Sequence, residues 1–373
     1  VEAGYNSADI RGNKAVIAGG ISISYVEEIL PKDISLIKIT AYPIDREWLA
    51  NVVSQHTEVL VVEELMPVIE EEVRQAASTT VVHGKLDGCL PHEGEFSTAL
   101  AAGALVKAGF LAENPCPASP EPAAVAVRPP ILCPGCLHRS VFYGMKKVFK
   151  DGVFPSDIGC YTLGLQMGAV DTTICMGASI TVGSGISHAC PETPVVSTIG
   201  DSTFLHTGVN GLVNAVYNKA NQTIIILDNR ITAMTGHQPN PNTCITATGV
   251  ESPKISLEEL TRACGVSFVE SVDPYDLTDL LETLKAAKER DGVKVIIAKQ
   301  PCVIMNKRNG VKRSRYVVDA ERCLKCGACI RYGCPAIETD ENGVSRTTAL
   351  CTGCGVCADI CPAGAIHRGG ARQ

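Results

Sequence analysis

The stretch Pro194-Val195-Val196-Ser197-Thr198-Ile199-Gly200-Asp201-Ser202 decides the fold of the middle of this chain. Its apolar run is typical of a buried strand, and the Gly-Asp pair stands where that strand would end. A helix-like stretch follows, and a second apolar run at 223–227 leads into Asp228-Asn229-Arg230. The pattern predicts a strand–helix–strand unit, whose two parallel strands end at the same edge of a sheet.

Polar residues stand at both of these strand ends. Asp201 and Asn229 are 28 residues apart, which suits neighbouring strands of such a unit. A carboxylate, an amide oxygen and a backbone carbonyl, here that of Ile231, form a ligand set that suits a hard cation such as Mg²⁺. Phosphate oxygens and water would complete the coordination, so we expect magnesium diphosphate here. A Gly-Asp pair alone also marks an ordinary turn, and the later asparagine is what favours the ligand site.

The same alternation of strands and helices extends on both sides of this unit. Strand-like runs at 15–18, 35–39 and 59–62 alternate with helical stretches at 45–55 and 67–77, and strand-like runs at 195–199, 223–227 and 293–298 follow later. This order predicts an α/β fold class with parallel sheets covered by helices. Six prolines between residues 115 and 130 predict an extended linker between the two α/β parts.

Composition excludes several classes of protein. Apolar residues make up 45% and charged residues 20%, which is typical of a globular protein. The net charge of −7, without a Lys/Arg block, argues against binding to nucleic acid or to an anionic membrane. The longest apolar stretch, at 99–112, is short and contains Lys107, so we expect a packed helix there. Because the sequence begins with Val1 rather than Met, we expect a segment upstream to be missing.

Two cysteine runs fill the C-terminal tail. The run Cys351-x2-Cys354-x2-Cys357-x3-Cys361-Pro362 resembles the bacterial two-cluster ferredoxins, in which the fourth cysteine ligates the other cluster. The upstream run repeats the spacing with one extra residue before its last cysteine. We therefore expect two [4Fe-4S] clusters, one held by Cys323, Cys326, Cys329 and Cys361, the other by Cys334, Cys351, Cys354 and Cys357. Two structural zinc sites are the alternative, which three consecutive short steps disfavour. Thiols in metal-type runs, rather than disulfides, predict a reducing cytoplasm.

The two signals together resemble a known family. Gly200-Asp201-Ser202 followed by Asn229 resembles the thiamine diphosphate motif, with Ser202 in place of the final glycine. A thiamine diphosphate site combined with a two-cluster ferredoxin tail resembles the 2-oxoacid:ferredoxin oxidoreductases. The stretches 132–139, 157–164 and 171–179, together with the longer spacing before Cys334, are similar to the alpha subunits of indolepyruvate ferredoxin oxidoreductases.

This resemblance implies a domain organisation. It assigns residues 1–113 to a transketolase C-terminal-like domain, 114–130 to the proline-rich linker, 131–306 to a thiamine diphosphate-binding domain and 307–373 to a two-cluster [4Fe-4S] ferredoxin domain. The family's N-terminal pyrimidine-binding domain, whose glutamate activates the cofactor, has no counterpart in the sequence. We therefore expect either a truncated chain or a separate polypeptide that carries this domain.

The resemblance also assigns residues to the cofactors. Gly200 and Ser202 would approach the diphosphate, and the stretch Met176-Gly177-Ala178 would lie along the cofactor. His138 is the expected catalytic residue, although a single histidine more often hydrogen-bonds a loop. Related enzymes hold a further [4Fe-4S] cluster beside thiamine, and the residues that match its ligands are Cys133, Cys136, Cys160 and Cys302. Ordinary buried thiols are the alternative for these four.

The implied activity is the oxidative decarboxylation of arylpyruvates, such as indolepyruvate and phenylpyruvate, to aryl-acetyl-CoA through an enamine on thiamine diphosphate. Electrons would leave through the clusters to ferredoxin, and coenzyme A would take the acyl group. The expected partners are a small beta subunit, a polypeptide with the pyrimidine-binding domain, and ferredoxin, in a cytoplasmic hetero-oligomer of an anaerobe. Pyruvate or 2-oxoglutarate as substrate is one alternative. A non-catalytic electron-transfer subunit is another, against which Asp201 and Asn229 argue.

Overall fold

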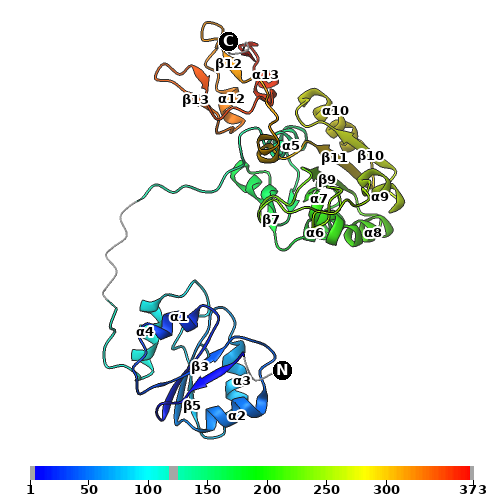
Figure 1. Ribbon diagram of the computed structural model, residues 1–373. Helices are drawn as coiled ribbons and strands as arrows, with labels where there is room; N and C mark the ends of the chain where they lie inside the picture. The colour runs from blue at the N-terminus through cyan, green and yellow to red at the C-terminus, as the bar shows by residue number, and fades with distance from the viewer. Residues whose placement is uncertain (1–4, 117–124, 370–373) are drawn as a thin grey trace. The chain divides into compact units, whose positions relative to one another are not determined.

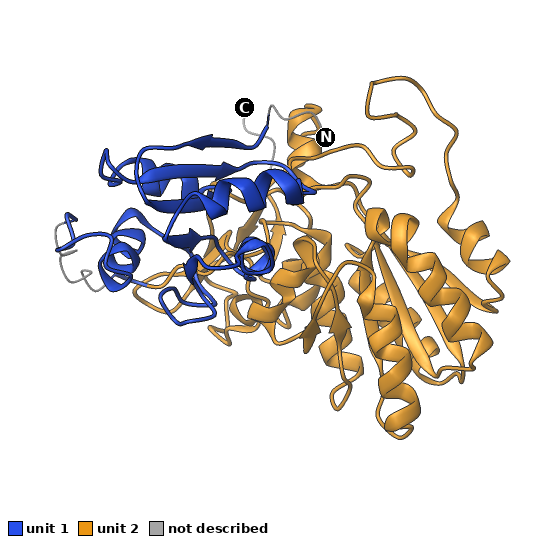
Figure 2. Ribbon diagram, turned by 90° about the horizontal axis from the view of Figure 1, so that it is seen from below, with its two compact units in different colours: residues 1–126 blue, residues 127–373 orange. Residues whose placement is uncertain are grey.

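The computed structural model describes residues 5–116 and 125–369. The chain divides into two compact units, residues 1–126 and 127–373, which Figure 2 distinguishes by colour. Part of the expected linker at 114–130 lies outside the described residues. The segments 131–306 and 307–373, predicted as separate domains, fall together in the second unit, so their boundary stays a prediction.

The first unit is built on a five-stranded sheet in the order β1-β3-β2-β4-β5. Its strands are β1 (Ser7–Asp9), β2 (Lys14–Gly19), β3 (Ser35–Ile39), β4 (Glu58–Val62) and β5 (Val81–His83). Strands β2 to β5 are parallel, and the short β1 pairs antiparallel with β3. Consecutive residues along β2 and β4 are buried on both faces, as apolar strands of a covered parallel sheet are. The strands predicted at 15–18, 35–39 and 59–62 are confirmed.

Four helices cover the two faces of this sheet (Figure 1). Helices α1 (Ser22–Glu27) and α4 (Thr98–Lys107) pack over the face that carries Val16. Helices α2 (Arg46–Ser54) and α3 (Val68–Ala76) pack over the face that carries Ile17. The side chain of Asp45 accepts a hydrogen bond from Trp48 N at 2.9 Å, so the first predicted helix residue is an N-cap. The helices predicted at 45–55 and 67–77 are thus confirmed, with their end residues serving as caps.

The second unit contains a four-stranded parallel sheet in the order β10-β11-β9-β8. Its strands are β8 (Val196–Gly200), β9 (Gln222–Asp228), β10 (Phe268–Val272) and β11 (Val293–Lys299). The chain passes from β8 to β9 through α7 (Asp201–Thr203), a π-helical turn (Phe204–Gly208) and α8 (Val209–Tyr217). The predicted strand–helix–strand unit is confirmed, and its two strands are direct neighbours.

Helices also cover both faces of this second sheet (Figure 1). Helices α6 (Ala178–Ala189), α8 and α9 (Leu257–Ala263) share one buried cluster with the sheet. Helices α5 (Leu137–Val148) and α10 (Leu277–Lys288) share the other. A short strand pair, β6 (Pro155–Ser156) with β7 (Thr172–Thr173), and a 3₁₀ helix at Cys160–Met167 complete this part, and α11 (Val303–Arg308) leads out of it.

The C-terminal region consists of two small strand pairs and two short helices. Strand β12 (Tyr316–Val318) pairs with β15 (Ile366–Arg368), and β13 (Ile337–Thr339) pairs with β14 (Ser345–Thr347). The helices are α12 (Ala328–Arg331) and α13 (Val356–Ile360). Its own buried cluster consists of Cys329, Cys357 and Ile366. Cysteines therefore occupy the place of a core, which is typical of small folds that metal binding stabilises.

None of the helices in the described ranges combines the length and the apolar character that crossing a bilayer requires. The apolar stretch at 99–112 instead forms α4, in which Ala101 and Leu105 are buried against the sheet of the first unit. The packed helix predicted for this stretch is confirmed.

Glu70 provides a test of the buried polar contacts in the first unit. Its fully buried carboxylate accepts the N–H of Lys85 at 2.6 Å and pairs with Arg74 at 2.7 Å. Glu70→Ala should lower the free energy of unfolding by about 3 kcal/mol, because buried donors lose their acceptor. Denaturation followed by the fluorescence of Trp48, the only tryptophan of the chain, measures this unit. The exposed neighbour Glu71→Ala should change stability by less than about 0.5 kcal/mol. Equal losses in both variants would contradict the role of Glu70.

Candidate cofactor and metal sites

The predicted magnesium ligands lie at one edge of the second sheet. Asp201 follows β8 directly, and Asn229 follows the neighbouring strand β9. Both are buried, with exposed fractions of 2% and 8%. The Oδ1 atom of Asn229 accepts the N–H of Ile231 at 3.1 Å, which holds the start of the next loop against the strand end. The topology therefore brings Asp201, Asn229 and Ile231 to the same sheet edge.

Two asparagines that the sequence analysis did not select complete this edge. Asn240 and Asn242 donate to Asp201 Oδ2 at 3.2 and 3.4 Å. Asn242 also donates to Oδ1 of Asp228, the last residue of β9, at 2.7 Å. Both asparagines lie in the irregular loop after β9. The only sequence signal for these two asparagines is the Asn-Pro-Asn triplet itself. The loop contains no predicted helix or strand that would indicate where the chain comes back to the sheet edge.

The electrostatics of this edge favour a cation. Burial, followed by the neighbouring Asp228 carboxylate, raises the pKa of Asp201 to about 7. Burial also raises the pKa of Asp228, against which Arg230 and Lys299 act. Two buried carboxylates thus face each other with amide donors between them, and a divalent cation would supply the missing positive charge. This donor set fits Mg²⁺, whose presence stays a prediction.

Asp157 organises the segments predicted to lie along the cofactor. This buried carboxylate accepts the N–H of Gly177 at 2.9 Å and the hydroxyl of Ser179 at 3.0 Å, at the start of α6. Gly177 has a φ of +93°, and a Cβ there would lie 2.6 Å from Thr207 Oγ1. The stretch 176–178 is therefore held in one position, and only glycine fits at its centre.

Tyr161 explains why a glycine ends β8. Its ring lies where a Cβ on Gly200 would come within 2.8 Å. Its hydroxyl donates to Asp157 and lies 3.1 Å from Thr203 Oγ1. Ser202, which replaces the final glycine of the thiamine diphosphate motif, accepts the hydroxyl of Thr232 at 2.9 Å. Contact of Gly200 or Ser202 with a diphosphate stays a prediction.

The four cysteines proposed for the further cluster meet in one pocket. They come from the loop before α5, from the start of the 3₁₀ helix and from the segment after β11, and they line one pocket: Cys133, Cys136, Cys160 and Cys302. Asn229 lines the same pocket, and Cys302 N donates to the Asn229 carbonyl at 3.0 Å. The cysteine pocket and the magnesium edge are thus adjacent.

Two histidines line this pocket as well. His138 is 2% exposed, stacks on Tyr161, and has its Nδ1 atom 3.3 Å from Cys136 Sγ. Burial lowers the pKa of His138 to about 4, so the ring is neutral at pH 7. The Nε2 atom of His237 is buried and has no hydrogen-bond partner within the described residues. The sequence analysis gave His237 no role, and its backbone with φ +67° has no sequence signature.

The eight C-terminal cysteines line two further pockets. One is lined by Cys323, Cys326, Cys329 and Cys361. The other is lined by Cys334, Cys351, Cys354 and Cys357. Each pocket therefore combines three cysteines of one run with the last cysteine of the other. The structure groups the cysteines in the sets that the ferredoxin-type spacing predicts.

The spacing of these thiols bears on the zinc alternative. Four sulfurs around one zinc ion lie about 3.8 Å apart, since Zn–S bonds are about 2.3 Å. In the described part of the chain, no three of these sulfurs lie within 4.8 Å of one another. The pockets therefore suit a polynuclear cluster better than a single ion.

A tight loop contact joins the pocket at Asn229 to the C-terminal region. Gly135, between Cys133 and Cys136, has a φ of +69° and lies so close to Thr352 that a Cβ would be 2.0 Å from its Oγ1. The Tyr275 hydroxyl donates to the Gly135 carbonyl at 2.5 Å. Gly135 also lines the pocket of Cys334, Cys351, Cys354 and Cys357. Two cysteine loops are thus in direct contact through a glycine.

Arg139 and Ser140 reinforce this junction from α5. Arg139 donates to the carbonyls of Gly333 at 2.5 Å and Leu132 at 2.6 Å. Ser140 Oγ lies 3.0 Å from the hydroxyl of Tyr332, a fully buried residue of the C-terminal region. These contacts fix the position of the C-terminal region against the second sheet's helices.

Gly135→Ala should loosen this junction. The new methyl group collides with Thr352, so hydrogen–deuterium exchange of the segment 351–357 should accelerate at least about tenfold, which corresponds to about 1.4 kcal/mol. Gly292→Ala is the matched control, because its φ is +79° and nothing lies within 4 Å of its Cβ position. Both variants carry the backbone cost of about 1–2 kcal/mol, and only the first should affect the junction. Equal exchange of 351–357 in the two variants would contradict the contact.

Comparisons with known protein families match two separate stretches of the second unit. The thiamine pyrophosphate enzyme C-terminal TPP binding domain matches residues 157–298, and the 4Fe-4S dicluster domain matches residues 315–367. The predicted fold class, an α/β thiamine diphosphate-binding part followed by a two-cluster ferredoxin-like part, is thereby confirmed. Thiamine diphosphate and iron–sulfur clusters are the cofactors that these matches support; magnesium and the number of clusters stay predictions.

Similar proteins extend the match to nearly the whole chain. The indolepyruvate oxidoreductase subunit IorA of Archaeoglobus fulgidus is 39% identical over 98% of this chain and 62% of its own length. The IorA subunit of Methanothermobacter thermautotrophicus is 41% identical over 94% of this chain and 59% of its own length. The 2-oxoacid:ferredoxin oxidoreductase subunit beta of Saccharolobus solfataricus is 27% identical over 47% of this chain and 62% of its own length. This chain thus spans about three fifths of the length of the IorA subunits.

Proposed function

Because this chain belongs to the family of the IorA subunits of indolepyruvate oxidoreductase, we propose that it acts in the ferredoxin-dependent oxidative decarboxylation of arylpyruvates to aryl-acetyl-CoA. One observation carries the proposal. Asn229, a residue of the magnesium edge, also lines the pocket of Cys133, Cys136, Cys160 and Cys302. A thiamine-type site and a site for one-electron carriers therefore share a wall, which suits a reaction that decarboxylates and oxidises in one place.

The residues of the magnesium edge would hold the cofactor. When bound, thiamine diphosphate supplies a nucleophilic carbon for the keto group and a sink for the electron pair that carbon dioxide leaves. Asp201, Asn229 and the Ile231 carbonyl would anchor Mg²⁺ and through it the diphosphate. Asn240 and Asn242 donate to Asp201 and so fix the orientation of its carboxylate.

The side chains around the shared pocket would shape the reacting centre. The walls contributed by Leu132, Leu137 and Leu163 are apolar, which limits access of water. His138 is neutral and buried, and it can donate or accept one hydrogen bond there. His237 adds at the same pocket a ring nitrogen for which residues 5–116 and 125–369 provide no hydrogen-bond partner. These two rings are the candidates for handling a proton near the substrate.

The succession of cysteine pockets supports removal of electrons one at a time. Gly135 joins the pocket beside Asn229 to the pocket of Cys334, Cys351, Cys354 and Cys357. The third pocket, lined by Cys323, Cys326, Cys329 and Cys361, includes residues of α12 in its wall. Ferredoxin, a one-electron carrier, would accept electrons from this end of the chain.

The proposed assembly is a hetero-oligomer. It comprises a small beta subunit, a polypeptide or chain segment with the pyrimidine-binding domain, and ferredoxin and coenzyme A as reactants. The similarity of part of this chain to a protein named as subunit beta of a 2-oxoacid:ferredoxin oxidoreductase supports an assembly of several subunits. We place the complex in the cytoplasm, because free thiols of this number require a reducing compartment.

Substrate profiling tests the proposed reaction. The complex, purified anaerobically with its partner polypeptides, should reduce ferredoxin with indolepyruvate or phenylpyruvate and coenzyme A at a kcat/KM above that with pyruvate or 2-oxoglutarate.

Asp201→Ala should lower kcat/KM by more than about 100-fold, because even residues that only hydrogen-bond to a metal's ligands contribute roughly 10–100-fold. The exposed Glu192→Ala is the control and should retain activity. A higher kcat/KM with pyruvate would contradict the proposed substrate class. Turnover that does not require thiamine diphosphate would contradict the proposed mechanism.

An iron count tests the further cluster. The chain purified anaerobically should contain about twelve irons, three clusters of four. Cys302→Ser should lower the count to about eight, while Cys190→Ser, at an exposed cysteine outside all three pockets, should not change it. About eight irons in the unaltered chain would mean that Cys133, Cys136, Cys160 and Cys302 are ordinary thiols.

A further inference from the structure

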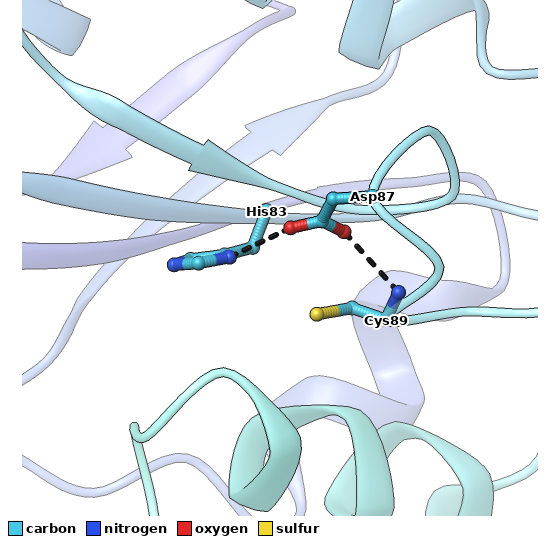
Figure 3. Close-up of side chains that lie close together, drawn as sticks. All are labelled: His83, Asp87 and Cys89. Carbon is cyan, nitrogen blue, oxygen red and sulfur yellow. Dashed lines mark hydrogen bonds and ion pairs between the residues drawn. The ribbon is translucent and has the colours of Figure 1, made fainter.

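A separate set of metal-type donors lies in the first unit. His83 ends β5, and the loop that follows brings Asp87 and Cys89 back to it (Figure 3). One ligand atom from each of the three residues lies within 4.8 Å of the other two. In Figure 3 the thiol sulfur of Cys89 lies below the Asp87 carboxylate, and the imidazole ring of His83 lies on the other side of that carboxylate from Asp87's own backbone. The proposed function makes no use of these residues.

Hydrogen bonds within the loop and to Glu70 hold the loop that carries the donors in one conformation. The buried carboxylate of Glu70 accepts the N–H groups of Lys85 at 2.6 Å and Leu86 at 3.2 Å. Gly88 has a φ of +77°, and its N–H donates to the Lys85 carbonyl at 2.9 Å, which closes a tight turn. Leu90 N donates to the Gly84 carbonyl at 3.1 Å. A ligand bound here would therefore find its donors already in place and would not have to order the loop.

Backbone donors orient the carboxylate at the centre of the set. Asp87 Oδ1 accepts the N–H of Gly84 at 3.0 Å and that of Cys89 at 3.2 Å. Asp87 Oδ2 remains for His83, whose Nδ1 lies 2.8 Å away. One carboxylate oxygen is thus held by the backbone while the other faces the ring and the thiol. Such outer hydrogen bonds position the ligands in known metal sites.

The surroundings leave room for an ion. The side chains of His83 and Asp87 are 25% and 33% exposed, so solvent reaches the open side of the set. Cys89 packs on the other side against the apolar cluster that includes Leu90 and Leu105. A nitrogen, an oxygen and a sulfur donor with one open position suit Zn²⁺, which takes three protein ligands and a water in such sites.

We propose that His83, Asp87 and Cys89 bind one Zn²⁺ ion, with water as the fourth ligand. Binding replaces the hydrogen bond between His83 and Asp87 by two metal bonds and releases the proton of the Cys89 thiol. The carboxylate and the thiolate together neutralise the ion. The site ties the end of β5 to the loop that leads towards α4.

The test uses the full chain with its iron–sulfur clusters loaded, so that the other cysteines are occupied. After equilibration with Zn²⁺ and gel filtration, metal analysis should find about one zinc per chain at an unchanged iron content. Zinc K-edge absorption should show one sulfur at about 2.3 Å and nitrogen or oxygen at about 2.0–2.2 Å. Zinc held by several sulfurs would place the ion at the cluster cysteines and would overturn the proposal.

Matched variants assign the site to its residues. Cys89→Ser and Asp87→Asn should each weaken zinc binding by more than about 100-fold. Asp87→Asn keeps an oxygen that accepts the two backbone N–H groups, so the loop keeps its fold, which the Trp48 unfolding transition checks. His92→Ala, at an exposed histidine of the same connecting segment, and Cys190→Ser should bind zinc as the unaltered chain does. Zinc affinity that is unchanged in Cys89→Ser would show that the three residues form only a hydrogen-bonded turn.

Discussion

Neighbouring parallel strands end at a common edge, and the chemistry of the second unit depends on this constraint. Strands β8 and β9 pair directly, so the residues that follow them, Asp201 and Asn229, lie at the same edge. The loop after β9 then has to pass over this edge, which is how Asn240 and Asn242 reach Asp201. The segment after β11 ends at the same place and brings Cys302 to the Asn229 carbonyl. Strand order therefore brings the predicted cation site next to Cys302, while Cys133, Cys136 and Cys160 reach the same pocket from segments outside the sheet.

In two places, side chains of the kind that bind metals are buried where apolar side chains would ordinarily pack. The C-terminal region buries few side chains of its own, and two of the three in its cluster are cysteines. Asp201 and Asp228 are buried with too little positive charge around them. In both places the protein carries a desolvation cost that a bound cation or cluster would offset. The stability of these parts and the presence of their cofactors are therefore coupled.

The junction at Gly135 shows why backbone detail matters for such a molecule. The loop of Cys133 and Cys136 and the loop of Cys351 and Cys354 approach so closely that no side chain fits between them. Hydrogen bonds from Tyr275 and Arg139 hold the two loops together. Contacts of this kind bring the two cysteine loops close together, because side chains would otherwise keep the loops apart.

The sequence by itself determined the central strands of both α/β parts, because apolar periodicity reflects burial directly, but it did not indicate β1, β5 or β10. It also determined the grouping of the eight C-terminal cysteines, since short spacings leave the chain few ways to surround a cluster, and it indicated Asp201 and Asn229 through the strand ends. Only the tertiary structure decided the positions of Asn240, Asn242, Asp157 and His237, all of which lie in irregular loops. It alone brought Gly135 against Thr352, and His83 against Asp87 and Cys89. Those contacts depend on turns and positive φ angles, and a loop's path is set by the elements around it rather than by its own residues.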